Sequence, residues 1–313
     1  MSSAELFGDG HVLAYAETSV QKTGRLLEMN SELFRANFNR RPFTIGHRLT
    51  GHPLFALPRL IELAGRIPQE SVEYNAGDIP VNMDPELTPR NGLSVEETIR
   101  RIEDCRSWMV LKNVESDSEY RALLNECLDE IQSLSEPLAP GMSRREGYIF
   151  ISSPGSVTPY HMDPEYNFLL QIRGRKTVNI FDPADRSIVS EQELEKYLLG
   201  GHRNLVFRDE YQQKAFTFEL TPGAGLHFPV TAPHWVRNGD EVSISFSITF
   251  RTPASDRRTS IYSFNSWLRS RGVNPAPFGQ SPARDSIKYF AFRAMRRTRK
   301  MLSRFMQEQA RNH

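Results

Sequence analysis

The stretch "TPYHMDPEYNFLLQIRGRKTVNIF", residues 158–181, decides how the rest of the chain is interpreted. His161 and Asp163 are two positions apart, so one face of an extended strand carries both side chains. The residues that follow are largely apolar, and the chain turns at Gly174 before it reaches Lys176. Because the surroundings are apolar, we expect the imidazole and the carboxylate to point into the protein rather than into water.

A histidine and a carboxylate offered together are two of the three ligands of the facial triad that is typical of non-haem Fe(II) oxygenases. The third ligand should be a histidine on a distant strand. The stretch "HFPVTAPHWV" offers two candidates, His227 and His234. They are seven positions apart, so on one continuous strand they would point to opposite faces and only one would reach the metal.

The composition of the segments changes after Pro140. "GYIFISSPG", "NFLLQIRG", "KTVNIFDP", "AFTFELTPG" and "VSISFSITFRT" are short, rich in β-branched and aromatic residues, and punctuated by Gly or Pro. Most of them have no helix between them, which favours an antiparallel sandwich or barrel. We therefore predict a mostly β core with flanking helices.

The rest of the chain is interpreted as mainly helical. Residues 1–110 are expected to form a mainly helical N-terminal region packed on the core, with a capping box from Ser94 to Glu97. The core itself is expected over residues 111–255, with a helical insertion at "SEQELEKYLLGG". Residues 256–313 are expected to form a helical, basic C-terminal region.

Together these residues resemble the JmjC, or cupin-like, branch of the Fe(II)- and 2-oxoglutarate-dependent oxygenases. The pattern is similar to that of the asparaginyl hydroxylase that acts on the hypoxia-inducible factor. The similarity extends over residues 140–252 and includes "HMD", "QIRGRK" and "PHWV". It implies a double-stranded β-helix (a jelly roll) that holds Fe(II) through His161, Asp163 and His234.

The resemblance also implies where 2-oxoglutarate binds. In the family, a lysine on the strand after the first two ligands binds the far carboxylate, assisted by a threonine just before the first histidine. Lys176 lies 15 positions after His161 (176 − 161 = 15), and Thr158 lies three before it. Asn167 matches a polar family residue beside the co-substrate.

Two further hydroxyl groups are candidates for contact with 2-oxoglutarate. Tyr148 begins a strand that should run alongside the site. Thr249 stands where the asparaginyl hydroxylase has an asparagine on its last core strand, so the polar contact expected there differs from the family's.

The function implied is hydroxylation of a C–H bond in a protein side chain, a peptide or a small molecule, with succinate and CO2 as co-products. Two alternatives stay open. One is a catalytically weak cupin-like binding module, and the other is a Zn²⁺ hydrolase, since histidine and carboxylate also suit zinc. Lys176 has no evident role in the zinc scheme. The sequence contains no GxxxxGK[ST], GxSxG or HExxH motif, so phosphoryl transfer, serine hydrolysis and zincin chemistry have no support.

The composition is that of an ordinary soluble globular protein, with 39% hydrophobic and 25% charged residues among 313. No apolar run approaches the ~20 residues that span a bilayer. "MSSAELFGDGHVLAYAE" at the N-terminus lacks a basic segment followed by an apolar one, so we expect no secretion signal. Cys105 and Cys127 show no metal-type spacing and are expected as reduced thiols, which favours the cytoplasm.

The C-terminal segment carries the charge asymmetry of the chain. Residues 281–313 hold nine Lys and Arg against two Asp and Glu, a net charge of +7. The apolar positions expected to form one helical stripe are Ile287, Phe290, Met295, Leu302, Phe305 and Met306. Three interpretations are open: a helix packed on its own domain, a homodimer through C-terminal helices as in relatives of this fold, or contact with nucleic acid or an anionic membrane.

Overall fold

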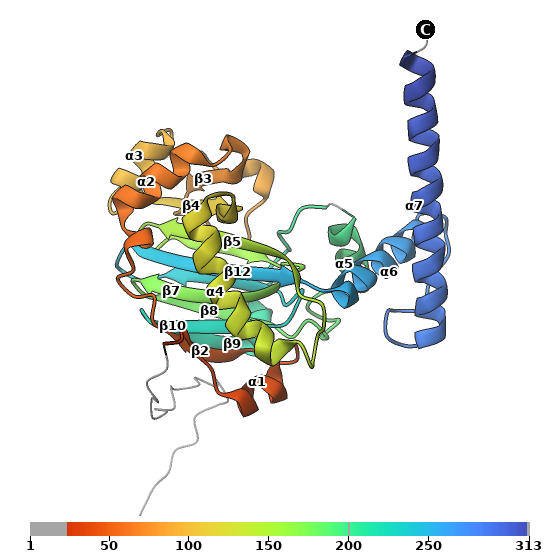
Figure 1. The fold of residues 1–313 in the computed structure, drawn as a ribbon, viewed down its shortest axis with the longest axis horizontal. Coiled ribbons are helices and arrows are strands. Elements are labelled where there is room, and N and C mark those ends of the chain that lie inside the picture. Colours follow the sequence, from red (N-terminus) through yellow and green to blue (C-terminus); the bar gives the residue numbers. More distant parts are fainter. Residues whose placement is uncertain (1–23, 200, 312–313) are drawn as a thin grey trace, which may run out of the picture. The chain divides into compact units, whose positions relative to one another are not determined.

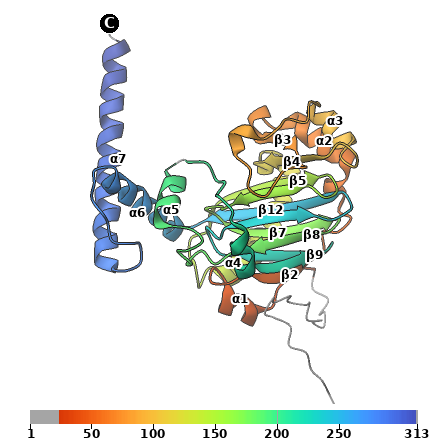
Figure 2. The same ribbon diagram turned by 180° about the vertical axis from the view of Figure 1, so that it is seen from behind.

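A computed structural model describes residues 24–199 and 201–311. The chain forms two compact units (Figures 1 and 2). The first comprises the described residues up to Ile188 together with Asn204–Arg251. The second comprises Val189–Arg203 and the described residues from Thr252 onward. The N-terminal stretch on which the expected lack of a secretion signal rests lies outside the described residues.

Two antiparallel sheets make up the first unit. The larger has the strand order β1 (Leu27–Glu28), β2 (Phe43–His47), β10 (Ala224–Phe228), β7 (Tyr166–Arg173), β12 (Ser243–Arg251), β5 (Ser143–Ser152), β4 (Ser107–Lys112) and β3 (Val72–Ala76). The smaller has the order β6 (Val157–His161), β11 (His234–Asn238), β8 (Lys176–Ile180) and β9 (Phe216–Leu220). This is the mostly β, cupin-like jelly roll that the sequence predicted, and that prediction is confirmed.

Side-chain alternation along β12 shows how the larger sheet separates two environments. The residues from Ser243 to Thr249 alternate between hydroxyl-bearing and apolar side chains. The apolar residues, such as Phe246, join a core that also contains Leu124 and Leu128 of α4 (Ser118–Ser135). Figure 1 shows α4 lying over this face of the sheet. The hydroxyl groups point the other way, so β12 contributes polar groups to the opposite face, beside apolar residues of other strands such as Leu169 and Phe228.

Short helices cap the ends of the sheet strands. They are α1 (Ser31–Asn37), α2 (Leu57–Arg66) and α3 (Val95–Arg100), with 3₁₀ turns at η1 (Pro53–Phe55), η2 (Gln69–Ser71), η3 (Pro85–Leu87), η4 (Val114–Ser116) and η5 (Asp209–Lys214). α3 begins with the predicted capping box, in which the Ser94 hydroxyl accepts from the Glu97 amide and the Glu97 carboxylate accepts from the Ser94 amide.

The expectation of mainly helix and loop in residues 1–110 missed four strands, β1 to β4. β2 pairs with β10, and β4 pairs with both β3 and β5. The larger sheet therefore crosses residue 110, where the sequence placed the start of the β core. These strands are only two to six residues long, and they are ordered by partners far away in the chain.

The second unit is helical, as predicted. It contains α5 (Glu191–Leu198), α6 (Pro253–Arg269) and α7 (Pro282–Arg311). An ion pair of 2.8 Å between Glu195 and Arg269 joins α5 to α6. Ile287 and Phe290 of α7 are exposed by 68% and 63%. The side chains of Leu302, Phe305 and Met306, which complete the predicted stripe, lie outside the described residues.

Within the described part of the chain, no helix has the length and apolar character that crossing a membrane requires.

Gly174 is required by the turn that passes the chain from β7 to β8. Its φ is +69°, and a methyl group there would overlap the carbonyl oxygen of Val242. Gly174→Ala should therefore lower the free energy of unfolding by more than the roughly 1–3 kcal/mol of a strained backbone conformation. Gly155, with φ of +70° and no atom within 4 Å of a methyl group placed on it, is the control. Chemical denaturation of both alanine variants measures the difference, and equal losses would contradict the overlap.

Candidate metal centre

Antiparallel pairing of β6 and β11 brings two histidines together. His161 is the last residue of β6, His234 is the first of β11, and the two are direct partners in the register. Their ring centroids are 4.1 Å apart. Asp163 follows β6 by two residues, and its Oδ2 lies 3.7 Å from Nε2 of each histidine. One ligand atom from each residue falls within 4.8 Å of the others.

Backbone carbonyl groups orient both imidazole rings. Nδ1 of His161 lies 2.7 Å from the carbonyl oxygen of Pro159, and Nδ1 of His234 lies 3.0 Å from that of Ala232. A carbonyl oxygen can only accept, so Nδ1 carries the hydrogen in each ring. The unprotonated Nε2 atoms therefore face the centre with Asp163. Two imidazole nitrogens and one carboxylate, held in this way, fit a divalent transition metal.

His227 is excluded from this group by its own hydrogen bonds. Its Nε2 accepts from the Asn39 amide at 3.1 Å, and its Nδ1 donates to the carbonyl oxygen of Asn167 at 2.8 Å. His227 lies on β10 and His234 on β11, in different sheets, so the two were never on one continuous strand. Burial lowers the pKa of His227 to about 4, which keeps the ring neutral.

A small cavity of about 30 Å³, partly open to solvent, adjoins the three ligands. Its lining residues are Phe150, Thr158, His161, Asp163, Asn167, Leu169, Lys176, Phe228, His234 and Val236. Six of the eight residues predicted for the site are thus brought together. The apolar members were not predicted, although Leu169 and Val236 each follow a predicted residue by two positions and so share its face.

Lys176 is the one cation among the described residues that line this cavity. It begins β8 and is 5% exposed. Among the described residues, its ammonium group has no ion pair or hydrogen bond. Burial lowers its pKa from 10.5 to about 7, because no nearby anion offsets the loss of water. The lysine therefore favours an anionic ligand in the cavity.

Asn167 has a free donor on the same cavity. Its Oδ1 accepts from the Ser247 hydroxyl at 2.8 Å. Within the described residues its Nδ2 has no partner, so the amide can donate to a ligand. Thr158 pairs with Val236 across β6 and β11 and adds a hydroxyl to the lining.

The geometry agrees with a match over residues 90–256 to the family described as the cupin-like domain, a match that covers more than half of the chain. The chain belongs to the cupin-like domain family.

Two curated relatives of this cupin-like protein carry the name "Lysine-specific demethylase 8". The one from Danio rerio is 28% identical over 102 residues, which is 31% of this chain and 24% of the relative. The one from Xenopus tropicalis is 31% identical over 104 residues, or 31% of this chain and 22% of the relative. The match thus spans less than a quarter of the length of either relative.

Solved structures with a similar fold include that of ycfD from Escherichia coli, with a TM-score of 0.48 and 18% identity over 86% of this chain and 68% of that one. Another is YcfD, described as a ribosomal oxygenase, in complex with cobalt and 2-oxoglutarate. It has a TM-score of 0.46 and 17% identity over 82% of this chain and 61% of that one.

Tyr148 and Thr249 do not line the cavity of the cupin-like domain. The Tyr148 hydroxyl donates to the Glu146 carboxylate at 2.8 Å, and burial raises the pKa of this tyrosine. The Thr249 hydroxyl donates to the Glu146 carbonyl oxygen at 3.1 Å. Because both hydroxyls already have partners, neither residue is retained as a contact for the co-substrate.

Glu165 is a charged neighbour that sequence reasoning missed. It forms an ion pair with Arg251 at the end of β12. Burial, and secondarily the charge of Asp163, raise the pKa of Glu165 to about 7. The pair ties the segment after Asp163 to the larger sheet.

Replacing His161, Asp163 or His234 by Ala should weaken Co²⁺ binding by at least about 100-fold, beyond the 10–100-fold typical of residues that only support a ligand. His227→Ala should still bind one Co²⁺ per chain, since its nitrogens face Asn39 and Asn167. Calorimetric titration of the apoprotein gives both affinity and stoichiometry. Loss of the site in His227→Ala alone, with His234→Ala unaffected, would assign the third ligand to His227.

Proposed function

We propose that this protein is an Fe(II)- and 2-oxoglutarate-dependent oxygenase that hydroxylates a C–H bond of a protein side chain, a peptide or a small molecule. Succinate and CO2 are the co-products, with one oxygen atom of O2 entering the substrate and the other entering succinate. One observation carries the proposal: the cavity that adjoins the His161, Asp163 and His234 group also contains an uncompensated buried lysine.

The residues divide the work of binding between the two ends of the co-substrate. His161, Asp163 and His234 would hold Fe(II) on one face and leave other positions open. When bound, Fe(II) supplies the activation of O2 that is coupled to decarboxylation of the 2-oxo acid. Lys176 would bind the far carboxylate of 2-oxoglutarate, with Thr158 and Asn167 as further donors.

The apolar lining strengthens this arrangement. Phe150, Leu169, Phe228 and Val236 surround the polar groups, and Phe228 lies 4.6 Å from the His234 ring between centroids. Fewer waters compete in such a cavity, so an ion pair to Lys176 is stronger than at the surface. The same residues would keep water from the reacting carbon.

The two alternatives account for less of the structure. A zinc hydrolase uses the three ligands but leaves a buried lysine without a role. A binding module would bind the dicarboxylate without turnover, and it would leave the group of His161, Asp163 and His234 without a catalytic role. The finer resemblance to the asparaginyl hydroxylase branch rests on the spacing of Thr158 and Lys176, whereas Thr249 departs from that branch. We therefore propose the reaction and leave the residue type of the substrate open.

Two free thiols, Cys105 and Cys127, support our proposal of a cytoplasmic location.

The oxygenase should form succinate from 2-oxoglutarate with Fe(II) under air, and Lys176→Ala should weaken 2-oxoglutarate binding by about tenfold to a hundredfold. A hydrogen bond to a charged group contributes about 1.5–3 kcal/mol, and the variant loses that contact. Co²⁺ affinity should stay unchanged in this variant. Dicarboxylate binding without any succinate would support the binding module instead.

The pH dependence of binding tests the same contact. A carboxylate partner favours the charged form of lysine. 2-Oxoglutarate should therefore raise the pKa of Lys176 above the value of about 7 that it has in the protein without ligand. Affinity should therefore fall as pH rises from about 7 to 9, and binding should take up a proton in that window. Calorimetry in two buffers of different ionisation enthalpy measures the uptake, which Lys176→Ala should abolish.

For the quaternary structure, we propose a homodimer through the C-terminal helices, because Ile287 and Phe290 leave apolar surface on α7. Replacing both by Gln should yield monomers in light scattering, whereas Val273→Gln, at an exposed residue outside the helix, should leave the dimer intact. An unchanged mass in the double variant would contradict this interface. Salt-sensitive binding of RNA or anionic vesicles, retained in the same variant, would favour a polyanion partner.

A further inference from the structure

The turn that follows α1 contacts the metal centre through a chain of hydrogen bonds. Asn39 occupies this turn with a left-handed backbone, at φ of +54°. Its backbone amide donates to Nε2 of His227 at 3.1 Å. Its side-chain Oδ1 accepts from the backbone amide of Val230 at 2.9 Å. A single residue, remote in sequence from the ligands, thus holds both β10 and the segment that follows it.

The segment 229–233 connects β10 to β11 and leads directly to His234. Thr231, 1% exposed and also left-handed at φ of +62°, donates its amide to the carbonyl oxygen of Asp163 at 2.8 Å. Ala232 supplies the carbonyl oxygen that orients the His234 ring. This one segment therefore holds the backbone of one ligand and the side chain of another, and Asn39 holds the segment from its other side.

His227 extends the chain of contacts to the co-substrate side of the cavity. Its ring packs against both Phe38 and Phe168, with centroids 4.9 and 4.5 Å away. Because Nε2 accepts from the Asn39 amide, Nδ1 carries the hydrogen and donates to the carbonyl oxygen of Asn167. The ring is fully buried and neutral, so this orientation has no competing charged form.

We infer that Asn39 is a positioning residue for the metal centre, acting through Val230 on the segment that holds Asp163 and His234. The inference rests on the proposed metal site but on no step of the reaction. Two properties of asparagine are used here. The residue tolerates a left-handed backbone, which most residues adopt only at a cost, and its side chain provides the acceptor for Val230.

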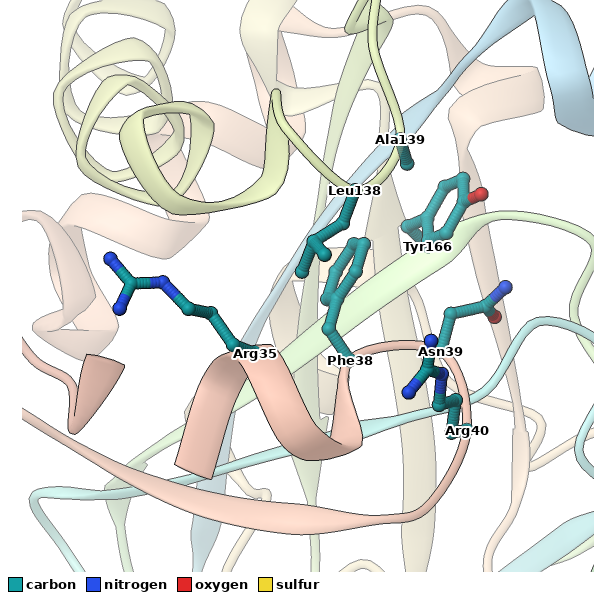
Figure 3. Close-up of a pocket in the computed structure, with 7 residues that line it drawn as sticks. All are labelled: Arg35, Phe38, Asn39, Arg40, Leu138, Ala139 and Tyr166. Atoms are coloured by element: carbon teal, nitrogen blue, oxygen red, sulfur yellow. The ribbon is translucent and has the colours of Figure 1, made fainter. Parts of the chain in front are cut away.

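The surroundings of Asn39 allow these two properties to be separated by substitution. Figure 3 shows Asn39 beside Arg40 on the turn after α1, with Phe38 and Tyr166 next to it. It borders an open pocket of about 220 Å³ and is half-buried. Glycine at this position keeps the left-handed backbone but removes the acceptor. Aspartate keeps both. Neither change overfills the core.

Asn113 provides a matched control. It is also a left-handed asparagine, with φ of +53°, and it lies before η4 in the same unit. Its side-chain amide donates to the Ser71 hydroxyl at 3.5 Å, and among the described residues no hydrogen bond joins it to the segment 229–233 or to the ligands. Asn113→Gly therefore repeats the chemical change of Asn39→Gly at a site that does not support the metal centre.

The experiment measures Co²⁺ affinity and the Co²⁺ absorption spectrum of the full-length protein. Asn39→Gly should weaken Co²⁺ binding by about tenfold, the lower end of the range for groups that support ligands indirectly, and should alter the spectrum. Asn39→Asp should restore affinity to within about threefold of the original, and Asn113→Gly should leave affinity and spectrum unchanged. Thermal unfolding of each apoprotein reports general stability separately.

Three results would overturn the inference: full affinity in Asn39→Gly, equal loss in Asn113→Gly, or no recovery in Asn39→Asp. The first would make Asn39 a structural residue only, the second would trace the loss to general destabilisation, and the third would deny the role of the acceptor. Failure of the unaltered protein to bind Co²⁺ would instead refute the metal centre of the proposed function.

Discussion

The register of β6 against β11 is the constraint on which the site depends. It sets His161 opposite His234, so backbone hydrogen bonds fix the separation of the two imidazoles before any metal binds. The arrangement is costly without a cation, because two nitrogen lone pairs and a carboxylate face one another at close range. Carbonyl groups on Nδ1 prevent the rings from turning away. The same pairing places Thr158 and Val236 beside the ligands, so the cavity wall follows from the register as well.

The cavity has opposite electrostatic character at its two ends. The ligand end carries Asp163 and, nearby, the Glu165–Arg251 pair. Lys176, the cation among the described lining residues, pairs with Asn238 at the end of β11 that is opposite to His234. A cation at the first end and a carboxylate at the second would each neutralise a group that burial destabilises. A molecule that spans the cavity with one end chelating and the other anionic meets both needs, which is the form of 2-oxoglutarate. Binding of metal and co-substrate should thus stabilise the fold that receives them.

Local patterns predicted what depended on local geometry. The spacing of His161 and Asp163 predicted that the two side chains meet, although Asp163 lies two residues beyond the end of β6 and not on the expected strand face. The strands after Pro140 showed their composition directly. β2 was not predicted from the sequence because its five residues are ordered by β10, a partner far along the chain. Tyr148 and Thr249 lie on the expected strands, but their hydroxyls donate to Glu146, through a contact within β5 for Tyr148 and a cross-strand contact for Thr249. Neither hydrogen bond is specified by the spacing from which the two residues were predicted.

The connections around β8 differ sharply in length. The short Gly174 turn joins β7 to β8 with no room for a side chain at the glycine, because the backbone at Val242 and Ser243 lies against it. The connection from β8 to β9 instead contains α5 and η5, and it returns to form a bridge between Asn204 and His161. Evolution can therefore lengthen or rewrite this second connection beside the metal while the turn that sets Lys176 stays unchanged. A family built in this way can change what it acts upon without rebuilding how it acts.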